Sequence, residues 1–403
     1  MSGLPAPEPV PAAGERLPCP ACGTAGGRPV VRRPAVPVMA GMLYPTREAA
    51  RVAPVGAIEL VACERCSMLR NVAFDEDLVD YEGSYDNSLH FSPTFQRYAD
   101  ELARRLVERY DLRDVTIVEI GSGKGDFLRA LCELGGNRGL GYDPAYQGEQ
   151  GKTVDRLTFV PEYFTGELSV VPDLFCARHV LEHLVAPSTL LGSVRRSSTD
   201  STVLYAEVPD AGYVLSAAGV WDVIYPHVGY YTAPALAHLV ARCGFAPLEV
   251  ATSFGGQYLW VEGRATSGSA ASSTSAAPST EDVEVALAQA DGFAELHRKT
   301  VGSWADQMAD AHRRGLRVAL WGAGTKGVTF LTTVPGAADV ATVVDVNPRK
   351  HGRFLPGTGH EVVGPDALAA APADMVLVMN PVYEGEIRRS LADLGLDATV
   401  AVV

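Results

Sequence analysis

Two glycine-rich turns, about two hundred residues apart, limit what this 403-residue chain can fold into. Residues 121–125 read GSGKG and residues 322–327 read GAGTKG, and each turn follows a short apolar run. Between a strand and a helix, such glycines let the backbone approach a nucleotide-like ligand, which then faces the N-terminus of the helix. The pattern predicts two nucleotide-binding α/β units in one chain, and therefore an enzyme with several domains.

Short apolar runs alternate with helix-length segments around both turns, which is typical of a parallel, doubly wound sheet. Two strands, at 245–252 and 257–262, are expected to close the first sheet as an antiparallel hairpin. A parallel sheet closed in this way is the layout of class I methyltransferases. The other expected strands are 57–62, 115–120, 139–142, 174–177, 203–208, 318–321, 340–345 and 375–379, with helices at 95–110 and 282–314.

The chain is long enough for two or three domains, each with its own core. We expect a small cysteine-rich domain over residues 1–75, an α/β core over 76–264 and a C-terminal α/β domain over 281–403. Residues 265–280 contain only Ala, Ser, Thr, Gly and one Pro. Because such a stretch has few apolar groups to pack, we expect it to be a flexible linker.

Charge and hydropathy narrow the choice of partners. The net charge of −14 weighs against a nucleic-acid partner or an anionic membrane, since both require basic protein surface. No apolar run approaches the roughly 18 residues of a membrane-spanning helix, and the N-terminus lacks the layout of a signal peptide. We therefore expect a cytoplasmic enzyme with a small-molecule substrate, acting as a monomer or loose dimer without nucleic-acid or membrane partners.

Four of the seven cysteines form two CxxC pairs near the N-terminus. Thiolates in paired CxxC knuckles favour tetrahedral zinc in a reducing compartment, and four protein ligands leave no open position for a substrate. We expect a structural Zn²⁺ site, with redox-active or unliganded thiols as the alternative. The predicted ligands are Cys19, Cys22, Cys63 and Cys66.

The first turn has the pattern Glu119-x-Gly121-x-Gly123-x-Gly125, which differs from the dinucleotide fingerprint in its last spacing. It suits a ligand without a pyrophosphate, and Asp143 at the end of the next strand can accept hydrogen bonds from both hydroxyls of a ribose. These features predict an S-adenosylmethionine site, with a Rossmann domain for another nucleotide as the alternative. The expected contacts are Glu119, Gly121, Gly123, Gly125 and Asp143, with Glu162 and Tyr163 beside the adenine.

Two histidines, His179 and His183, lie four residues apart in the run ARHVLEHL. In a helix they would share a face, although the order of residues is not the HExxH order of a zinc protease. We expect His179 to contact the cofactor and His183 to take part in chemistry. Packing or capping beneath the cofactor is the structural alternative for either side chain.

In their order along the chain, the four-cysteine module, the core with EIGSGKGDFL and ARHVLEHL, and the C-terminal WGAGTKG turn resemble the three-domain sugar C-methyltransferases of bacterial antibiotic pathways. The resemblance extends from Cys19 to about Tyr383. It implies methylation of carbon 3 of a nucleoside-diphosphate 4-keto-deoxysugar, such as a dTDP sugar. It also implies zinc at the four cysteines and cofactor contacts at Glu119, Gly121 and Asp143.

For catalysis, the resemblance implies that His183 is the base and that residues 225–232 form a second active-site loop. It places a tyrosine of the segment 81–85 near the sugar and the nucleotide beside the Lys326 turn. The family typically has Glu immediately before the histidine of this loop, but Pro226 stands there in this chain. Proline has no side-chain group that could accept or relay a proton, so the identity of the base and of the methylated atom stays open.

Methylation next to a ketone needs a base that removes the α-proton and a donor that holds the enolate oxygen. We expect His183 or His227 to be the base, because neutral imidazole suits this role near neutral pH. Anchoring of the loop is the alternative for His227. The expected donors are Tyr81, Tyr85 and Tyr225, and the expected substrate contacts are Gly324, Thr325, Lys326 and Tyr230.

Other functions remain open. Because Pro226 replaces Glu, an O-methyltransferase or a methyltransferase for a non-sugar scaffold is the first alternative. Residues 322–327 also fit GxGxxG, and Asp345 follows at the spacing of a dinucleotide site, which would suit an NAD(P)-dependent or bifunctional enzyme. A zinc-ribbon binding protein with a degenerate core is the last alternative.

Overall fold

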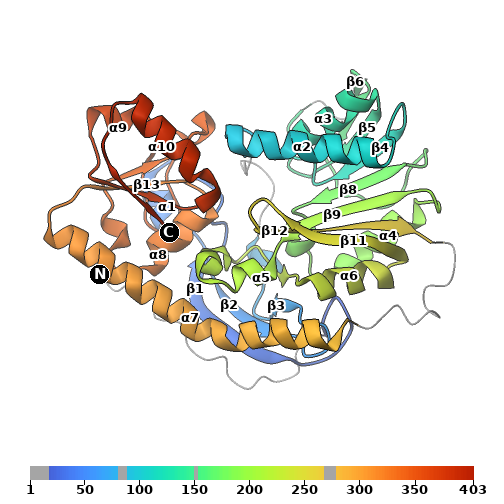
Figure 1. The fold of residues 1–403 in the computed structure, drawn as a ribbon, viewed down its shortest axis with the longest axis horizontal. Helices are drawn as coiled ribbons and strands as arrows, with labels where there is room; N and C mark the ends of the chain where they lie inside the picture. The colour runs from blue at the N-terminus through green and yellow to red at the C-terminus, as the bar shows by residue number, and fades with distance from the viewer. Residues whose placement is uncertain (1–17, 80–88, 149–152, 267–277) are drawn as a thin grey trace.

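The computed structural model describes residues 18–79, 89–148, 153–266 and 278–403. Within these residues, the strands form three sheets, which Figure 1 shows side by side with the long helix α7 (Thr280–Arg313) along one edge of the molecule. The mixed α/β class expected from the sequence is confirmed.

The largest sheet has eight strands in the order β11-β12-β9-β8-β4-β5-β7-β6. Its central strands are parallel, and β11 and β12 close it as an antiparallel hairpin, as the sequence predicts. Its strands are β4 (Thr116–Ile120), β5 (Arg138–Tyr142), β6 (Thr153–Val154), β7 (Leu157–Val160), β8 (Leu174–Arg178), β9 (Val203–Pro209), β11 (Phe245–Ser253) and β12 (Tyr258–Ala265); its helices are α2 (Pro93–Arg109), α3 (Asp126–Gly135), α4 (Pro187–Arg196) and α6 (Ala233–Arg242).

The C-terminal sheet has five parallel strands in the order β15-β14-β13-β16-β17. The second glycine turn follows β13, which is at the centre of this sheet. The strands are β13 (Val318–Trp321), β14 (Thr342–Val344), β15 (Val362–Val363), β16 (Met375–Val378) and β17 (Thr399–Val402), with α8 (Thr325–Thr333), α9 (Ala367–Ala370) and α10 (Glu384–Asp393).

The third sheet contains the cysteine-rich segment together with one strand from much later in the chain. It is antiparallel, in the order β1-β2-β3-β10, with β1 (Arg28–Pro37), β2 (Val55–Ala62), β3 (Leu69–Asn71) and β10 (Gly229–Tyr230). Since β10 belongs to the loop over 225–232, this loop is fixed by backbone hydrogen bonds to the N-terminal part of the chain. Shorter elements include α1 (Arg47–Arg51), α5 (Ala211–Val214), η2 (Leu181–His183) and η3 (Ala217–Asp222).

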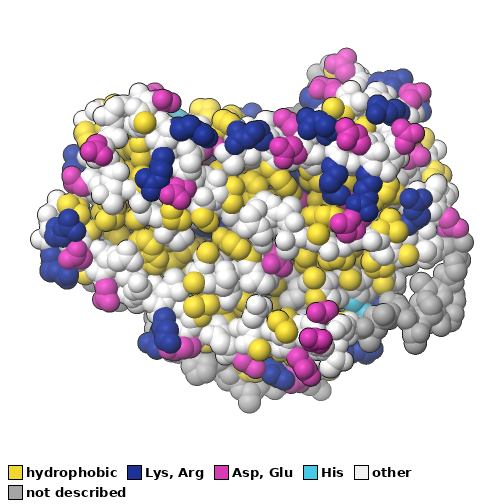
Figure 2. Space-filling model, in the orientation of Figure 1, with side chains coloured by type: hydrophobic (Ala, Val, Ile, Leu, Met, Phe, Trp, Pro, Cys, Tyr) yellow, Lys and Arg dark blue, Asp and Glu magenta, His cyan; other side chains and the backbone are white. Residues whose placement is uncertain are grey.

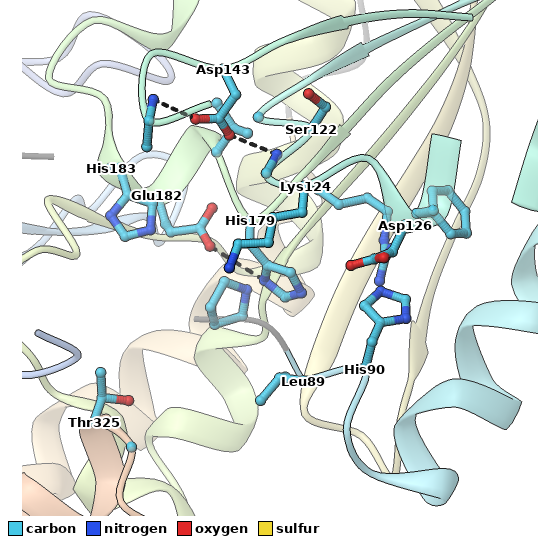
Figure 3. Close-up of a pocket in the computed structure, with 18 of the residues that line it drawn as sticks. Leu89, His90, Ser122, Lys124, Asp126, Asp143, His179, Glu182, His183 and Thr325 are labelled. Atoms are coloured by element: carbon cyan, nitrogen blue, oxygen red, sulfur yellow. Dashed lines mark hydrogen bonds and ion pairs between the residues drawn. The ribbon is translucent and has the colours of Figure 1, made fainter. Parts of the chain in front are cut away.

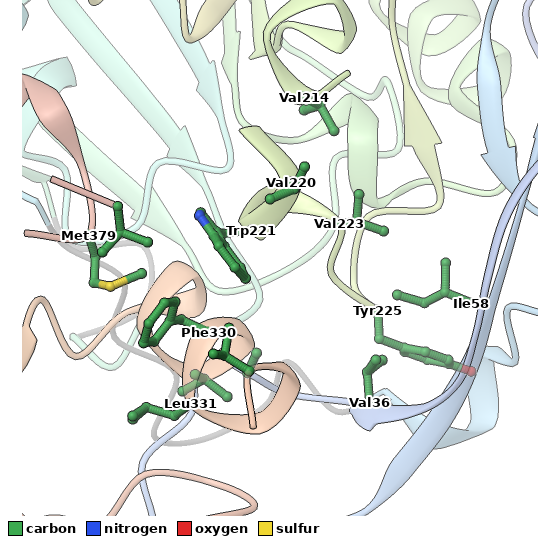
Figure 4. Close-up of a cluster of buried hydrophobic side chains, with 14 of the residues drawn as sticks. Val36, Ile58, Val214, Val220, Trp221, Val223, Tyr225, Phe330, Leu331 and Met379 are labelled. Carbon is green, nitrogen blue, oxygen red and sulfur yellow. The ribbon is translucent and has the colours of Figure 1, made fainter. Parts of the chain in front are cut away.

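One apolar cluster joins the N-terminal sheet, the segment of α5, η3 and β10, and the C-terminal unit. Trp221 of η3 packs against Phe330 of α8, with ring centroids 5.1 Å apart, and Val36 and Ile58 of the N-terminal sheet belong to the same cluster (Figure 4). Burial of a large aromatic side chain contributes a few kcal/mol, so these contacts strengthen the association of the parts. Ala265, at one end of the linker expected over 265–280, is still part of β12, and Thr280 already begins α7. 

In the ranges that the structure describes, no helix is both long enough and apolar enough to cross a membrane. On the face shown in Figure 2, basic and acidic side chains are interspersed. This face therefore lacks the single-sign basic field that a nucleic-acid-binding surface would need.

Candidate functional site

Both glycine turns open into one cleft of about 1840 Å³. A pocket for a single drug-sized ligand usually has roughly 300–1000 Å³, so this cleft has room for two ligands. One wall comes from the carboxyl ends of β4, β5 and β8, and the opposite wall from the segments that follow β13, β14 and β16. Figure 3 shows part of this cleft, with Asp143 on one side and Thr325 on the other.

The three glycines of the first turn all have positive φ, at 72° for Gly121, 53° for Gly123 and 83° for Gly125. A Cβ at Gly121 would collide with Val180, and one at Gly125 would collide with the ring of Phe159. A Cβ at Gly123, by contrast, would meet nothing within 4 Å. The outer glycines thus allow tight packing, and the middle glycine leaves its backbone open to a ligand.

Asp143 follows β5 and lies directly over the first turn (Figure 3). Its Oδ2 accepts a hydrogen bond from Gly123 N at 2.7 Å, and its Oδ1 accepts one from Ala145 N at 2.8 Å. A carboxylate can accept about four hydrogen bonds, so lone pairs remain for two ribose hydroxyls. The geometry is compatible with the cofactor contact expected for Asp143.

Glu119 in β4 is buried beneath the turn, and its Oε2 has no hydrogen-bond partner. Burial raises the pKa of this carboxyl to about 8, although the Arg178 guanidinium opposes the shift. Since a buried polar atom without a partner is rare, an approaching cationic ligand would relieve an unfavourable arrangement. Asp143, together with Glu119 once it is ionised, makes this wall suitable for a sulfonium and an ammonium group.

The loop after β7 contributes Glu162 and Tyr163 to the cleft, and the Tyr163 side chain is 66% exposed. Phe164, the next residue of this loop, is buried and packs edge-on against Tyr142 with centroids 5.1 Å apart. Because Phe164 and Tyr142 also line the cleft, they form an apolar surface beside the expected adenine position.

His179 follows β8 with a left-handed backbone, at φ 55°. Its Nδ1 lies 3.4 Å from Glu182 Oε1 and its Nε2 lies 3.4 Å from Glu207 Oε1. Burial alone would lower the pKa of His179, but these two carboxylates raise it to about 9. His179 is therefore charged at neutral pH and lines the cleft between the cofactor wall and β12.

Glu207 in β9 is fully buried, and sequence reasoning missed it because the residue lies inside an apolar strand. Burial would raise the pKa of this carboxyl, but Arg178, 3.0 Å away, lowers it. The Tyr205 hydroxyl donates to Glu207 at 2.8 Å, and the Tyr98 hydroxyl also donates to it. Glu207 thus fastens α2 and β8 to β9 beneath the site.

His183 and His227 meet in the cleft, with ring centroids 5.1 Å apart. His183 Nδ1 donates to the carbonyl oxygen of Pro226 at 2.9 Å when that nitrogen carries the ring proton, which leaves Nε2 as the basic nitrogen. Pro226 therefore contributes its carbonyl, although it has no acidic side chain. The sequence predicted both histidines, and the structure brings them together.

Glu182 is the third member of this group. One ring nitrogen from each of His183 and His227 and one carboxylate oxygen of Glu182 all lie within 4.8 Å of one another. Burial lowers the pKa of His227 to about 3, and His183 adds to this shift. His227 is consequently neutral at physiological pH, and its buried Nδ1 has no hydrogen-bond partner.

The tyrosines expected near the substrate are not brought to the cleft where the structure describes them. The Tyr225 hydroxyl accepts a hydrogen bond from Asp75 N at 2.9 Å, and the Tyr230 hydroxyl contacts the backbone of Ile224 at 3.1 Å. Both rings are buried in the core shared with the N-terminal sheet. Tyr81 and Tyr85 lie outside the described residues.

At the second turn, Gly324 caps α8, while Thr325 and Lys326 form its first turn. All three line the cleft. Lys326 Nζ is 2.9 Å from Asp222 Oδ2 and donates to Gln257 Oε1 at 3.1 Å, so it links the C-terminal unit to η3 and to the β11–β12 turn. No pattern in the sequence predicted this ion pair.

Basic side chains outnumber the aspartates around the second turn. Asp345, after β14, accepts hydrogen bonds from Ala323 N and Asn347 N, each at 2.9 Å, and Lys350 Nζ lies 2.9 Å from its Oδ2. Lys350, Arg349 and Arg353 also line the cleft. Lysine and arginine near a helix N-terminus favour an anionic ligand such as a diphosphate.

The four predicted zinc ligands meet in the N-terminal unit. Their sulfur atoms all lie within 4.8 Å of one another, with 3.6 Å between Cys19 and Cys66 and 3.4 Å between Cys22 and Cys63. Zinc–thiolate bonds of about 2.3 Å in a tetrahedron imply sulfur separations of about 3.8 Å, so the cluster fits zinc closely. All four are free thiols, and they lie outside the cleft lining.

Comparisons with known proteins match most of the chain. A family model described as a methyltransferase domain matches residues 94–250, and one described as a C-methyltransferase C-terminal domain matches residues 254–401. Together these matches support a C-methyltransferase family. Among curated protein sequences, no match was found.

Several solved structures are similar to part of the chain. The 1,6-didemethyltoxoflavin-N1-methyltransferase of Burkholderia thailandensis has 19% identity and a TM-score of 0.35, covering 43% of this chain and 81% of its own. Magnesium protoporphyrin IX methyltransferase of Synechocystis has 15% identity and a TM-score of 0.34, covering 46% and 90%. Human N-acetylserotonin methyltransferase has 15% identity and a TM-score of 0.33, covering 43% and 55%.

Proposed function

From the premise that this chain is an S-adenosylmethionine-dependent methyltransferase, we propose that it methylates the carbon next to the ketone of a nucleoside-diphosphate 4-keto-deoxysugar. One observation carries the proposal: an acidic glycine turn, a basic glycine turn and a pair of histidines line the same cleft. Such a cleft can hold a cationic methyl donor and an anionic nucleotide sugar together.

The donor end is formed by Glu119, the backbone of Gly121 and Gly123, Asp143 and the loop of Glu162. When bound, S-adenosylmethionine supplies a methyl group on a positively charged sulfonium. The carboxylates of this wall offset that charge, and Asp143 accepts from the ribose hydroxyls. His179 contacts both Glu182 and Glu207 and lies next to this wall of the cleft.

The acceptor end is formed by the second turn. The N-terminus of α8, with Gly324, Thr325 and Lys326, receives the diphosphate, and exposed Arg353 adds positive charge. The cofactor and the nucleotide then approach from opposite walls. The keto group of the sugar lies between them, next to the two histidines.

We assign the role of base to His183. Its Nε2 takes the proton from the α-carbon, and the electrons of that C–H bond form the enolate, whose charge collects on oxygen. The enolate carbon then accepts the methyl group, while the electrons of the breaking carbon–sulfur bond stay on sulfur. The imidazolium finally releases its proton to water, so the reaction yields the methylated ketone, the thioether and one proton.

The neutral ring of His227 is assigned to the enolate oxygen. An imidazole N–H in a site shielded from water stabilises developing negative charge strongly. A hydroxyl of Tyr81 or Tyr85 remains a second candidate donor. Orientation of the carbon nucleophile toward the methyl group contributes much of the remaining rate.

Exchange of the substrate α-proton with deuterium tests the assignment directly. His183→Asn is expected to abolish both exchange and methylation, whereas His227→Asn slows both by roughly 10²-fold. Binding of S-adenosylhomocysteine serves as the control for folding in each variant. Normal exchange and methylation in both variants would contradict the assignment.

O-methylation is the alternative that Pro226 favours, because a hydroxyl nucleophile needs less help from a base than a carbon acid does. The chemical shift of the new methyl carbon in the product separates the two reactions. A methoxy signal would replace our proposal with this alternative.

We also propose that the four-cysteine cluster holds a structural zinc ion. Metal analysis is expected to find one Zn²⁺ per chain, and Cys63→Ser is expected to lower the zinc content and the Tm. Cys176→Ser, which changes a buried cysteine outside the cluster, is the matched control for zinc content. Full zinc content in Cys63→Ser would contradict this site.

A further inference from the structure

We propose that Glu182 is a positioning residue for His183: its buried carboxylate stabilises the imidazolium that forms when Nε2 accepts the proton of the substrate. The inference rests on the proposed function, since it concerns the same proton transfer. Glu182 belongs to η2 and lies outside both glycine turns.

Burial is the first observation. The Glu182 side chain is 1% exposed, lines the cleft, and has no hydrogen-bond partner at either carboxylate oxygen. A buried carboxylate without hydrogen bonds is unfavourable unless nearby positive charge balances it. The imidazoles near Glu182 are those of His179, His183 and His227. His179 is already charged, with Nδ1 3.4 Å from Glu182 Oε1. His227 is neutral, so His183 is the ring that can gain a proton beside this carboxylate.

The neighbouring charges indicate that Glu182, and not Glu207, is the carboxylate that can balance a charge on His183. On β9, Glu207 is already balanced by Arg178 of β8, 3.0 Å away. Burial alone would raise the pKa of Glu182, but the contact with His179 lowers it, so the group is ionised. The Tyr231 hydroxyl, from the segment after β10, donates to Leu181 O and so does not donate to the Glu182 carboxylate.

The backbone fixes this arrangement before any substrate enters. Val228 N donates to Glu182 O at 2.8 Å, and His183 N donates to Val180 O at 3.0 Å. Together with the hydrogen bond from His183 Nδ1 to Pro226 O, these contacts connect η2 to the loop that contains His227. Glu182 therefore brings a carboxylate to both rings, which Pro226 cannot do.

The test is the pH dependence of methyl transfer in Glu182→Gln, which keeps the shape of the side chain and removes its charge. The acidic limb of the kcat/KM profile, where the base becomes protonated, is expected to move to lower pH, because the imidazolium loses its counter-charge. We expect kcat to fall roughly 10- to 100-fold, with the affinity for S-adenosylhomocysteine changed less than about twofold.

Glu182→Asp is the second variant, and it retains the charge on a shorter side chain. Its acidic limb is expected to move in the same direction by less, and it serves for the comparison if Glu182→Gln fails to bind S-adenosylhomocysteine. A lower kcat with an unmoved acidic limb would overturn the inference, because a merely structural role has that outcome.

This result is separable from a failure of the proposed function. If the wild-type protein methylates the 4-keto sugar but the limb does not move in the variants, the role of Glu182 is wrong and the function stands. If the wild-type protein neither exchanges the α-proton nor methylates such a sugar, the proposed function itself fails.

Discussion

The two glycine turns of this protein share a backbone plan and differ in charge. Gly121 N donates to Tyr142 O and Gly322 N donates to Val344 O, each at 2.8 Å, so both turns are anchored to the neighbouring strand in the same way. Each also receives an aspartate from the end of that strand, Asp143 in one unit and Asp345 in the other.

The side chains around the turns are opposite in character. Glu119 lies two residues before the first glycine of the core, whereas Leu320 occupies that place in the C-terminal unit. Asp345 is paired with Lys350 at 2.9 Å, and basic residues follow it into the cleft. The comparison indicates that the backbone of a βα turn can bind ligands of either charge. A few charged side chains beside the turn determine whether it binds a cation or an anion.

The largest expected effect contrasts two glycines. Gly125→Ala places a Cβ against the Phe159 ring at a φ of 83°, so the free energy of unfolding should fall by about 2–5 kcal/mol. Gly324→Ala is the matched control, because its φ is −107° and its Cβ would meet nothing within 4 Å. Urea unfolding measures both, and equal stabilities would refute the packing difference between the turns.

Exchange of the two aspartates for asparagine should separate the ligands. Asp143→Asn is expected to weaken S-adenosylhomocysteine binding roughly 10- to 100-fold, since hydrogen bonds to a charged group are each worth about 1.5–3 kcal/mol. Asp345→Asn should leave this affinity unchanged. Calorimetry measures both, and a similar loss in the two variants would mean that the second turn also binds the cofactor.

Charge at the second turn should affect only the nucleotide sugar. Arg353→Ala removes an exposed guanidinium from the cleft and is expected to raise the KM for the nucleotide sugar about three- to tenfold, less so at high salt. Arg389→Ala, an exposed arginine outside the cleft lining, is the control. An unchanged KM in Arg353→Ala would argue against a diphosphate at this wall.

The smallest expected effect is a dependence of S-adenosylmethionine affinity on pH, caused by Glu119 beneath the first turn. Burial raises the pKa of Glu119 to about 8 in the folded protein, so the stability that its neutral form contributes is present below its ordinary pKa and is lost as pH rises through 8. Binding of the cationic donor favours the ionised form. S-adenosylmethionine affinity should therefore rise a few-fold from pH 6 to 8, with proton release in calorimetry.

Glu119→Gln provides the control for this linkage and should make the affinity nearly independent of pH. A pH dependence that persists in this variant would assign the linkage to another group. Binding of a nucleoside diphosphate should show no such contribution from the second turn, where Leu320 replaces the carboxyl group.

Local patterns explain why much of the fold was predictable. The strands that flank both turns, the closing hairpin and the long helix before the C-terminal unit all follow from short-range periodicity and turn residues. The same locality explains why Asp143 lies at the end of the strand after the first turn, as predicted, because one helix and one strand separate it from Gly123. The sequence did not predict that Tyr225 and Tyr230 point into a core shared with the N-terminal sheet.

By itself, the sequence determined the α/β class, the glycine turns with their aspartates, and the four cysteines, because each depends on residues close together in the chain or on a fixed ligand chemistry. Only the tertiary structure decided that both turns face one cleft, that Pro226 O receives His183 Nδ1, and that Lys326 pairs with Asp222. These contacts join segments about 40 to 200 residues apart. They depend on how whole sheets pack together, which no local period of the sequence encodes.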